Sequence, residues 1–193
     1  MTVSEIKSKL ETQFPAIQIQ IVNDGLVVKA EDLPRVALFL KESPDFKMDY
    51  LSLITGVDYI EYLESVYHLY SAEKKTGPII LKVRVPRNEP HIPSLVSLYR
   101  GAEFQEREAY DMMGIIYDGH PDLRRIFMWE GFEGAPLRKD YIPEDDDVLE
   151  MEDVEWLERH GVKVPEEYKS FAEQLKASGK EARAVRPQPG AEP

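Results

Sequence analysis

The sequence predicts an α+β fold: a two-layer domain with the element order α-β-β-α-β-β-β-α, followed by an extended, largely irregular C-terminal strap and an acidic tail. Two patterns support this class. Stretches in which apolar residues recur every three to four positions are separated by stretches in which apolar and polar residues alternate. Beyond residue 115 neither pattern is sustained, and Gly, Pro, aromatic and then acidic residues become frequent.

The first part of the domain is predicted to be a helix followed by a hairpin. Ile6 and Leu10 lie four residues apart on one helical face, Ser4 is the candidate N-cap, and Pro15 ends the helix. Alternating isoleucines and a return run of valines predict a hairpin over residues 17–28.

A second helix and three strands follow. Asp32 is the candidate cap of a helix whose apolar stripe contains Leu33, Val36, Ala37 and Leu40. β-Branched and aromatic residues predict strands over residues 50–60 and 65–71, and strict alternation predicts a third over 79–85. Residues 93–113 are predicted to be helical, with Gly101 as a candidate break.

We therefore divide the chain into four parts: an α+β domain (1–115), an extended partner-binding strap (116–143), an acidic and partly helical extension (144–178), and a disordered tail (179–193). Tyr168, Phe171 and Leu175 suggest a short amphipathic helix within the extension. Two interpretations of the acidic extension stay open: it lies against a basic neighbour, or it is a solvated extension.

Composition excludes several functions. The net charge of −12 argues against direct binding to nucleic acid or to an anionic membrane surface. The absence of cysteine removes disulfides, thiolate nucleophiles, cysteine zinc sites and cysteine-held iron–sulfur clusters. No apolar run approaches the ~20 residues of a spanning helix, so we expect a soluble chain that a partner holds at any membrane where it works.

Some charged residues are candidates for a catalytic or metal site, but structural roles are favoured for them. Glu106 or Glu108 is a candidate general acid or base, whereas an ion-pair cluster in which Arg107 bridges Glu103 and Asp111 is favoured. A metal could be held by Asp118, His120 and Asp122 with Glu108 and Asp111, but this spacing matches neither His-Glu-x-x-His nor the calcium loop. A capping or hydrogen-bonding role for His120 is therefore favoured. Phosphate-binding glycine loops and the nucleophile-elbow motif are both missing.

Arginine and aromatic residues mix in the strap. Arg124, Arg125, Arg138 and Lys139 stand among Phe127, Trp129, Phe132 and Tyr141. Arg, Trp and Tyr dominate the energetics of protein interfaces, so a partner surface is favoured over a loop packed on its own domain.

Three segments carry a family resemblance: Glu106-Arg-Glu-Ala-Tyr-Asp-Met-Met-Gly-Ile115, Gly119-His-Pro-Asp-Leu-Arg-Arg-Ile126, and Pro136-Leu-Arg-Lys-Asp-Tyr141. In order and spacing they closely resemble the signature of the 30 kDa subunit of respiratory complex I, which is designated C in bacteria and J in cyanobacteria and plastids. The resemblance covers residues 1–143. The chain departs from the family at residues 128–132, where Pro-Glu-Asp-Trp is frequent, and at Ala135, where many members have His.

The resemblance implies a peripheral-arm subunit of a proton-translocating quinone oxidoreductase that uses NADH or a related donor. Such a subunit has no independent catalysis, cofactor or metal, because iron–sulfur clusters and flavin belong to partner subunits. It docks against the 49 kDa quinone-site subunit and neighbouring iron–sulfur subunits, on the cytoplasmic side of a plasma or photosynthetic membrane, by preference in a bacterium. The predicted partner-interface residues are Glu106, Arg107, Glu108, Asp111, His120, Arg124, Arg125, Trp129, Arg138, Lys139, Asp140 and Tyr141.

Two alternatives stay open. One is the equivalent scaffold subunit of a membrane-bound nickel–iron hydrogenase or a related ion-pumping complex, since such machines contain similar subunits. The other is an autonomous small hydrolase that uses Glu106, Asp111 and His120.

Overall fold

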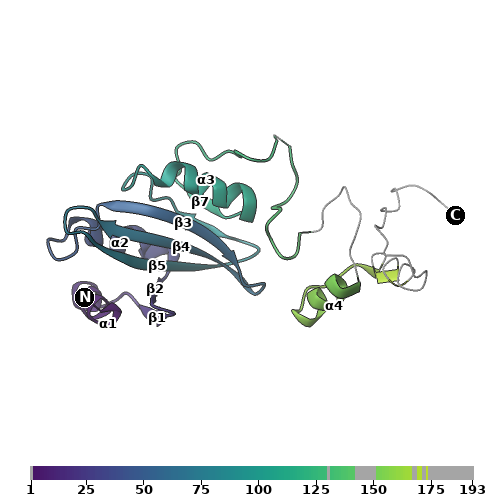
Figure 1. Ribbon diagram of the computed structural model, residues 1–193, viewed down its shortest axis with the longest axis horizontal. Helices are drawn as coiled ribbons and strands as arrows, with labels where there is room; N and C mark the ends of the chain where they lie inside the picture. The colour runs from purple at the N-terminus through teal and green to yellow at the C-terminus, as the bar shows by residue number, and fades with distance from the viewer. Residues whose placement is uncertain (1, 130, 142–150, 167–168, 171–172, 174–193) are drawn as a thin grey trace. The chain divides into compact units, whose positions relative to one another are not determined.

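A computed structural model describes residues 2–129, 131–141, 151–166, 169–170 and 173 (Figure 1). The chain divides into two compact units, Met1–Leu137 and Arg138–Pro193, and each is described by itself.

The first unit is built on a five-stranded sheet. Its spatial order is β1 (Gln20–Val22), β2 (Gly25–Val28), β5 (Thr76–Pro86), β4 (Tyr62–Ser71) and β3 (Tyr50–Asp58). Neighbouring strands are antiparallel except β2 and β5, which run parallel. Because side chains alternate across a strand, one face of β4 and β5 carries the apolar residues of the core.

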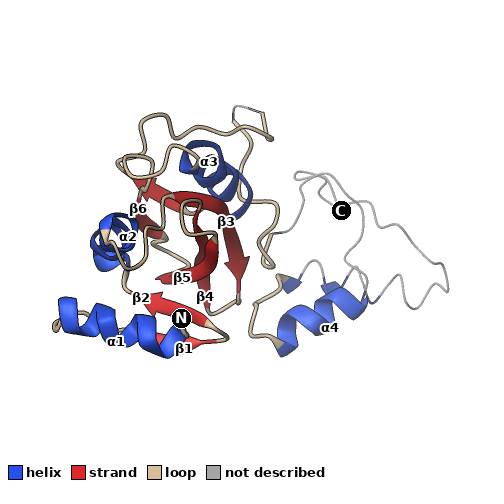
Figure 2. Cartoon of the chain, turned by 60° about the vertical axis from the view of Figure 1, so that its left-hand side comes forward, coloured by secondary structure: helices blue, strands red, loops and turns tan. Residues whose placement is uncertain are grey.

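Helices supply the second layer. They are α1 (Val3–Gln13), the short η1 (Ala30–Asp32), α2 (Leu33–Glu42) and α3 (Ala102–Met113). In Figure 1 the sheet lies in front of α2, with α3 above it and α1 below, and Figure 2 shows the same layers after a turn of 60°. The predicted apolar stripe of α2 is completely buried. The predicted α+β class is confirmed.

Three predicted elements differ in their ends. Thr2, not Ser4, caps α1, because the Thr2 hydroxyl accepts from the Glu5 N–H while the Glu5 carboxylate accepts from the Thr2 N–H. Asp32 makes no side-chain capping bond to α2. The predicted strand at residue 17 begins only at Gln20, although Ile17 and Ile19 are buried as the alternation required.

The predicted helix over residues 93–113 is wrong up to Gly101, the residue that we predicted as a candidate break. Its amino-terminal part forms β6 (His91–Pro93) and turns, and α3 starts after Gly101. β6 pairs in parallel with β7 (Ile116–Asp118), a strand inside the segment that we predicted to be irregular. A three-residue strand gives too short a pattern to be recognised in the sequence.

The second unit contains α4 (Met151–Arg159), whose Val154 and Leu157 pack with Val164. α4 lies within the extension that we predicted to be acidic and partly helical. The remainder of that prediction at 144–150, most of the predicted amphipathic helix and the predicted disordered tail lie outside the described residues. The first unit ends at Leu137, so much of the predicted strap belongs to the folded domain.

Candidate interaction site

Asp111 is the centre of a hydrogen-bonded cluster at the end of α3. Its side chain is completely buried, and Oδ2 accepts the backbone N–H groups of residues 126, 127 and 128 at 2.9, 2.6 and 3.0 Å. Arg125 Nη1 donates to Asp111 Oδ1 at 2.7 Å, and Arg125 Nη2 donates to the Gly134 carbonyl at 2.8 Å. Residues 125–128 are therefore pinned to the helix, and Arg125 also holds the Gly134 carbonyl.

The pKa of Asp111 reflects these donors. Burial by itself would raise the pKa of this carboxyl. The Arg125 guanidinium and the three backbone N–H groups outweigh burial and hold the pKa below its usual value. Asp111 is thus an anchor for the loop that follows, and its pKa is shifted towards the charged form.

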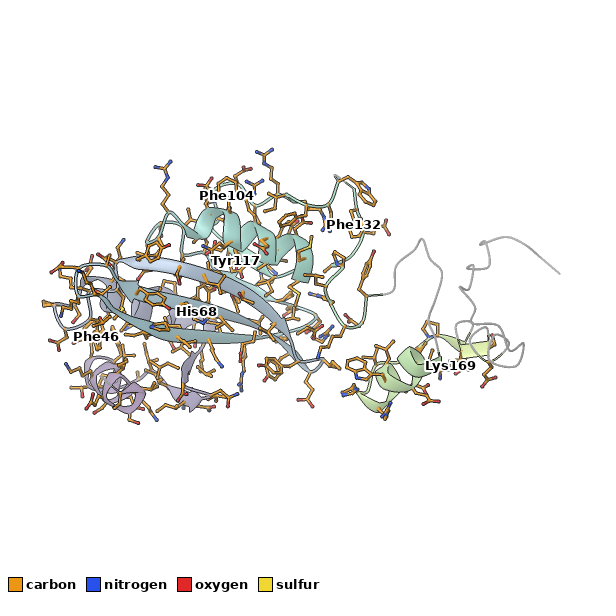
Figure 3. The ribbon with its side chains drawn as sticks, viewed as in Figure 1. Phe46, His68, Phe104, Tyr117, Phe132 and Lys169 are labelled. Carbon is orange, nitrogen blue, oxygen red and sulfur yellow. The ribbon has the colours of Figure 1, made fainter. Side chains whose placement is uncertain are left out.

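The pinned loop presents apolar side chains to solvent. We call residues 124–137 the aromatic loop. Phe127, Trp129 and Leu137 are 61%, 67% and 62% exposed. The Trp129 ring meets Phe132 edge-on at 4.8 Å between centroids, and Arg125 lies over the same Phe132 ring (Figure 3 labels Phe132). Large exposed side chains on a backbone fixed from within are typical of a docking surface.

Glu106 occupies a different environment one and a half turns earlier on α3. It is also completely buried, and it accepts the Ser94 hydroxyl at 2.6 Å and the Leu95 N–H at 2.7 Å. Burial raises the pKa of Glu106, and these two neutral donors oppose the shift only in part. Glu106 fastens α3 to the chain that follows β6.

A cluster of buried hydroxyl groups lies near Glu106. Tyr117 Oη and Ser65 Oγ are 3.0 Å apart, and Figure 3 shows Tyr117 below α3. Burial, together with the charge of Glu106, raises the pKa of both Tyr67 and Tyr117. Within the described residues the Tyr67 hydroxyl has no hydrogen-bond partner of normal geometry. Ser65 and Tyr117 were not predicted from the sequence, although strand alternation places Ser65 between the inward-facing Leu63 and Tyr67.

The predicted site residues separate into interior and surface groups. Glu106, Arg107 and Asp111 are buried, so the structure places them beneath the surface. Arg107 does not bridge Glu103 and Asp111 as predicted. Its Nε donates to the Arg124 carbonyl at 3.1 Å, and its guanidinium lies over the Phe104 ring. The exposed members are Glu108, Arg124, Trp129, Lys139 and Asp140, and the half-buried ones are His120, Arg125, Arg138 and Tyr141.

His120 has a structural role in the folded chain. Its Nε2 lies 2.9 Å from the Glu103 carbonyl, and its Nδ1 accepts the Asp122 N–H at 3.0 Å. Asp118 pairs with His91 and Asp122 with Arg124. Among the described residues no three His, Asp or Glu side chains form a group that could hold a metal ion.

In the part of the chain that the structure describes, no helix is both long and apolar enough to cross a membrane.

In the second unit, one residue of the predicted interface packs against α4. Lys139 lies over the Trp156 ring of α4, and that ring packs against His160 with centroids 4.1 Å apart. Trp156 was not among the predicted site residues. In the sequence it is a single Trp among acidic residues, and this pattern does not indicate which residue its ring contacts.

Comparison with known proteins identifies similar chains. The family described as "Respiratory-chain NADH dehydrogenase, 30 Kd subunit" matches residues 26–147. An NADH-quinone oxidoreductase subunit of Rhizobium meliloti is 48% identical over 120 residues, which are 61% of this chain and 65% of that protein. The corresponding protein of Herpetosiphon aurantiacus, also named as an NADH-quinone oxidoreductase subunit, is 37% identical over 157 residues, which are 79% of this chain and 91% of that protein. This chain thus spans just under two thirds of the first relative and nearly all of the second.

Two solved structures are similar. A trypsin-resistant fragment (1–134) of Nqo5 superposes with a TM-score of 0.50 at 28% identity, covering 63% of this chain and all of that one. A chain of the membrane-bound sulfane sulfur reductase, an archaeal respiratory membrane complex, gives a TM-score of 0.58 at 23% identity, covering 83% of this chain and 92% of that one. The latter likeness supports the fold alone.

Proposed function

The chain belongs to the family of the 30 kDa subunit of respiratory-chain NADH dehydrogenase, and from this premise we propose that it is a peripheral-arm subunit of a proton-translocating NADH:quinone oxidoreductase. In this proposal it contributes shape and adhesive surface, and partner subunits hold every flavin and iron–sulfur cluster. The lack of cysteine supports this division, because protein-bound clusters are held by thiolates.

The proposed partners are the 49 kDa quinone-site subunit and the neighbouring iron–sulfur subunits, with the chain on the cytoplasmic side of the membrane. The observation that carries the docking role is the aromatic loop. Asp111 and Arg125 fix its backbone before any partner arrives, while Phe127 and Trp129 stay exposed. A fixed loop loses little conformational entropy on binding, so burial of its rings translates into affinity.

The alternatives are less well supported. The relatives described above are named as NADH-quinone oxidoreductase subunits, which favours this assembly over a hydrogenase. The autonomous hydrolase would need Glu106, Asp111 and His120 to converge on a substrate. Instead each hydrogen-bonds to a different stretch of backbone: residue 95, residues 126–128 and residue 103.

Replacement of Trp129 tests the docking role. Because the ring is 67% exposed, Trp129→Ala should change the unfolding free energy of the isolated chain by only about 0.5 kcal/mol. The yield of assembled complex from cells carrying all subunits should fall about tenfold, as for an interface hot spot. Ile21→Ala, at a 41% exposed position on β1, is the matched control and should assemble normally. Normal assembly and turnover of Trp129→Ala would refute the docking role.

A further inference from the structure

The sheet has a second surface, opposite to the core, that we call the outer face. Strand register defines two of its rows. Leu53 on β3, His68 on β4 and Ile80 on β5 lie side by side, and the next row contains Thr55, Val66, Lys82 and Val27. Leu53 is 44% exposed, and at the end of the same face Tyr50 is 57% exposed. Lys82 thus lies between Val66 and Val27 on a face that still meets solvent.

Lys82 has only a distant carboxylate partner in the folded chain. Its side chain is only 10% exposed, and Nζ lies 4.0 Å from Glu64 Oε1. Within the described residues it makes no hydrogen bond. Its stem lies across Gly25, where an added Cβ would come within 2.6 Å of Lys82 Cε. The stem is therefore held in place, while the ammonium keeps donors that Glu64 does not take up.

The neighbouring charges indicate which further acceptor would suit Lys82. Glu64 is 1% exposed and already accepts from Arg84 Nε at 2.7 Å, while Arg84 also lies over the Tyr62 ring. Two cations thus share one carboxylate on this face of a chain whose net charge is −12. A second carboxylate is the group best suited to accept hydrogen bonds from the Lys82 ammonium.

We infer that the outer face docks a segment of another polypeptide of the complex, which covers Leu53, Val66 and Ile80 with apolar side chains and places an Asp or Glu carboxylate on Lys82. A second copy of this chain fits less well, because face-to-face stacking would bring Lys82 and Arg84 against like charges. A small anion would leave the apolar rows in water. The inference rests on the proposed function for the identity of the assembly, but it uses a surface other than the aromatic loop.

Substitutions at two outer-face positions test the inference in the complete complex. Leu53→Asp should lower the yield of assembled complex about tenfold, since it puts a charge into the apolar row. Leu38→Asp is the matched control, because Leu38 is 39% exposed on α2, and it should assemble normally. If Leu53→Asp assembles as well as the control, the outer face is not an interface.

Lys82→Met separates binding from folding. Because Arg84 keeps Glu64 paired at 2.7 Å and Met replaces the apolar stem of Lys82, the isolated full-length variant should melt no lower than the wild type while its assembly falls about tenfold. A lower melting temperature with a proportionate loss of assembly would overturn the inference and make Lys82 structural. Wild-type assembly of Lys82→Met would overturn it as well.

Cross-linking identifies the occupant. A photoreactive phenylalanine analogue in place of Leu53, activated in the assembled complex, should attach to a partner segment that contains Asp or Glu. Attachment only to a second copy of this chain, or to no protein, would refute the inference. The aromatic loop and the outer face are tested independently. If Trp129→Ala blocks assembly and Leu53→Asp does not, the proposed function is supported and the outer-face inference is refuted.

Discussion

Two regions of α3 shift the pKa of a buried carboxyl in opposite directions. Glu106 and Asp111 are both completely buried carboxyls on one helix, yet the pKa of Glu106 is raised and that of Asp111 is lowered. Glu106 has two neutral donors, whereas Asp111 has a guanidinium and three backbone N–H groups. Burial raises the pKa of both carboxyls, and only at Asp111 do the donors outweigh it.

The two regions consequently respond to pH with opposite sign. The folded pKa of Glu106 lies above its unfolded value of about 4.3, so its contribution to stability is complete below that pH and is lost as pH rises through the folded pKa. The folded pKa of Asp111 lies below about 3.9, so its contribution is complete above that pH and is lost as pH falls through the folded pKa.

Removal of Asp111 should have the largest effect. Asp111→Ala leaves Arg125 and three backbone N–H groups without their acceptor, and we expect a loss of about 3–5 kcal/mol in the unfolding free energy, measured by chemical denaturation. The variant should also lose less stability than the wild type between pH 4 and 2, roughly the range in which an aspartate of lowered pKa titrates. Glu108→Ala, at an exposed position of the same helix, is the control. If Asp111→Ala and Glu108→Ala have equal unfolding free energies, the buried carboxylate of Asp111 does not anchor the loop.

Arg125→Lys should have an intermediate effect. Lysine keeps the positive charge beside Asp111 but has no planar fork to reach Asp111 and the Gly134 carbonyl together. We expect a loss of about 1–2 kcal/mol in denaturation, with a smaller loss of assembled complex than for Trp129→Ala. Unchanged stability would show that charge alone, without the fork, holds the aromatic loop.

Glu106→Gln should have the smallest effect at neutral pH. The amide can still accept the Leu95 N–H and contact Ser94, so we expect a change within about 1 kcal/mol. The diagnostic result is the pH trend: from pH 5 to 8 the wild type should lose stability relative to Glu106→Gln, as followed by thermal melts. A loss at pH 8 as large as that of Asp111→Ala would contradict the raised pKa of Glu106.

The sequence by itself determined the local structure and the family. Each informative pattern lies in one continuous stretch: the stripe from Leu33 to Leu40, the alternation over residues 79–85 and the signature from 106 to 141. The helix, the strand and the family could therefore be inferred without knowledge of tertiary contacts. The sequence also placed the mix of arginine and aromatic residues that forms the aromatic loop.

Only the tertiary structure decided what those residues meet. Helical spacing offered Arg107 to Asp111, but folding brought Arg125 and three backbone N–H groups from 14 to 17 positions further along to that carboxyl. It likewise put Ser94 against Glu106, and Lys82 at 4.0 Å from a Glu64 carboxylate that Arg84 also binds. Periodicity records which side of an element is buried, whereas the partner of a buried charge depends on how distant elements pack.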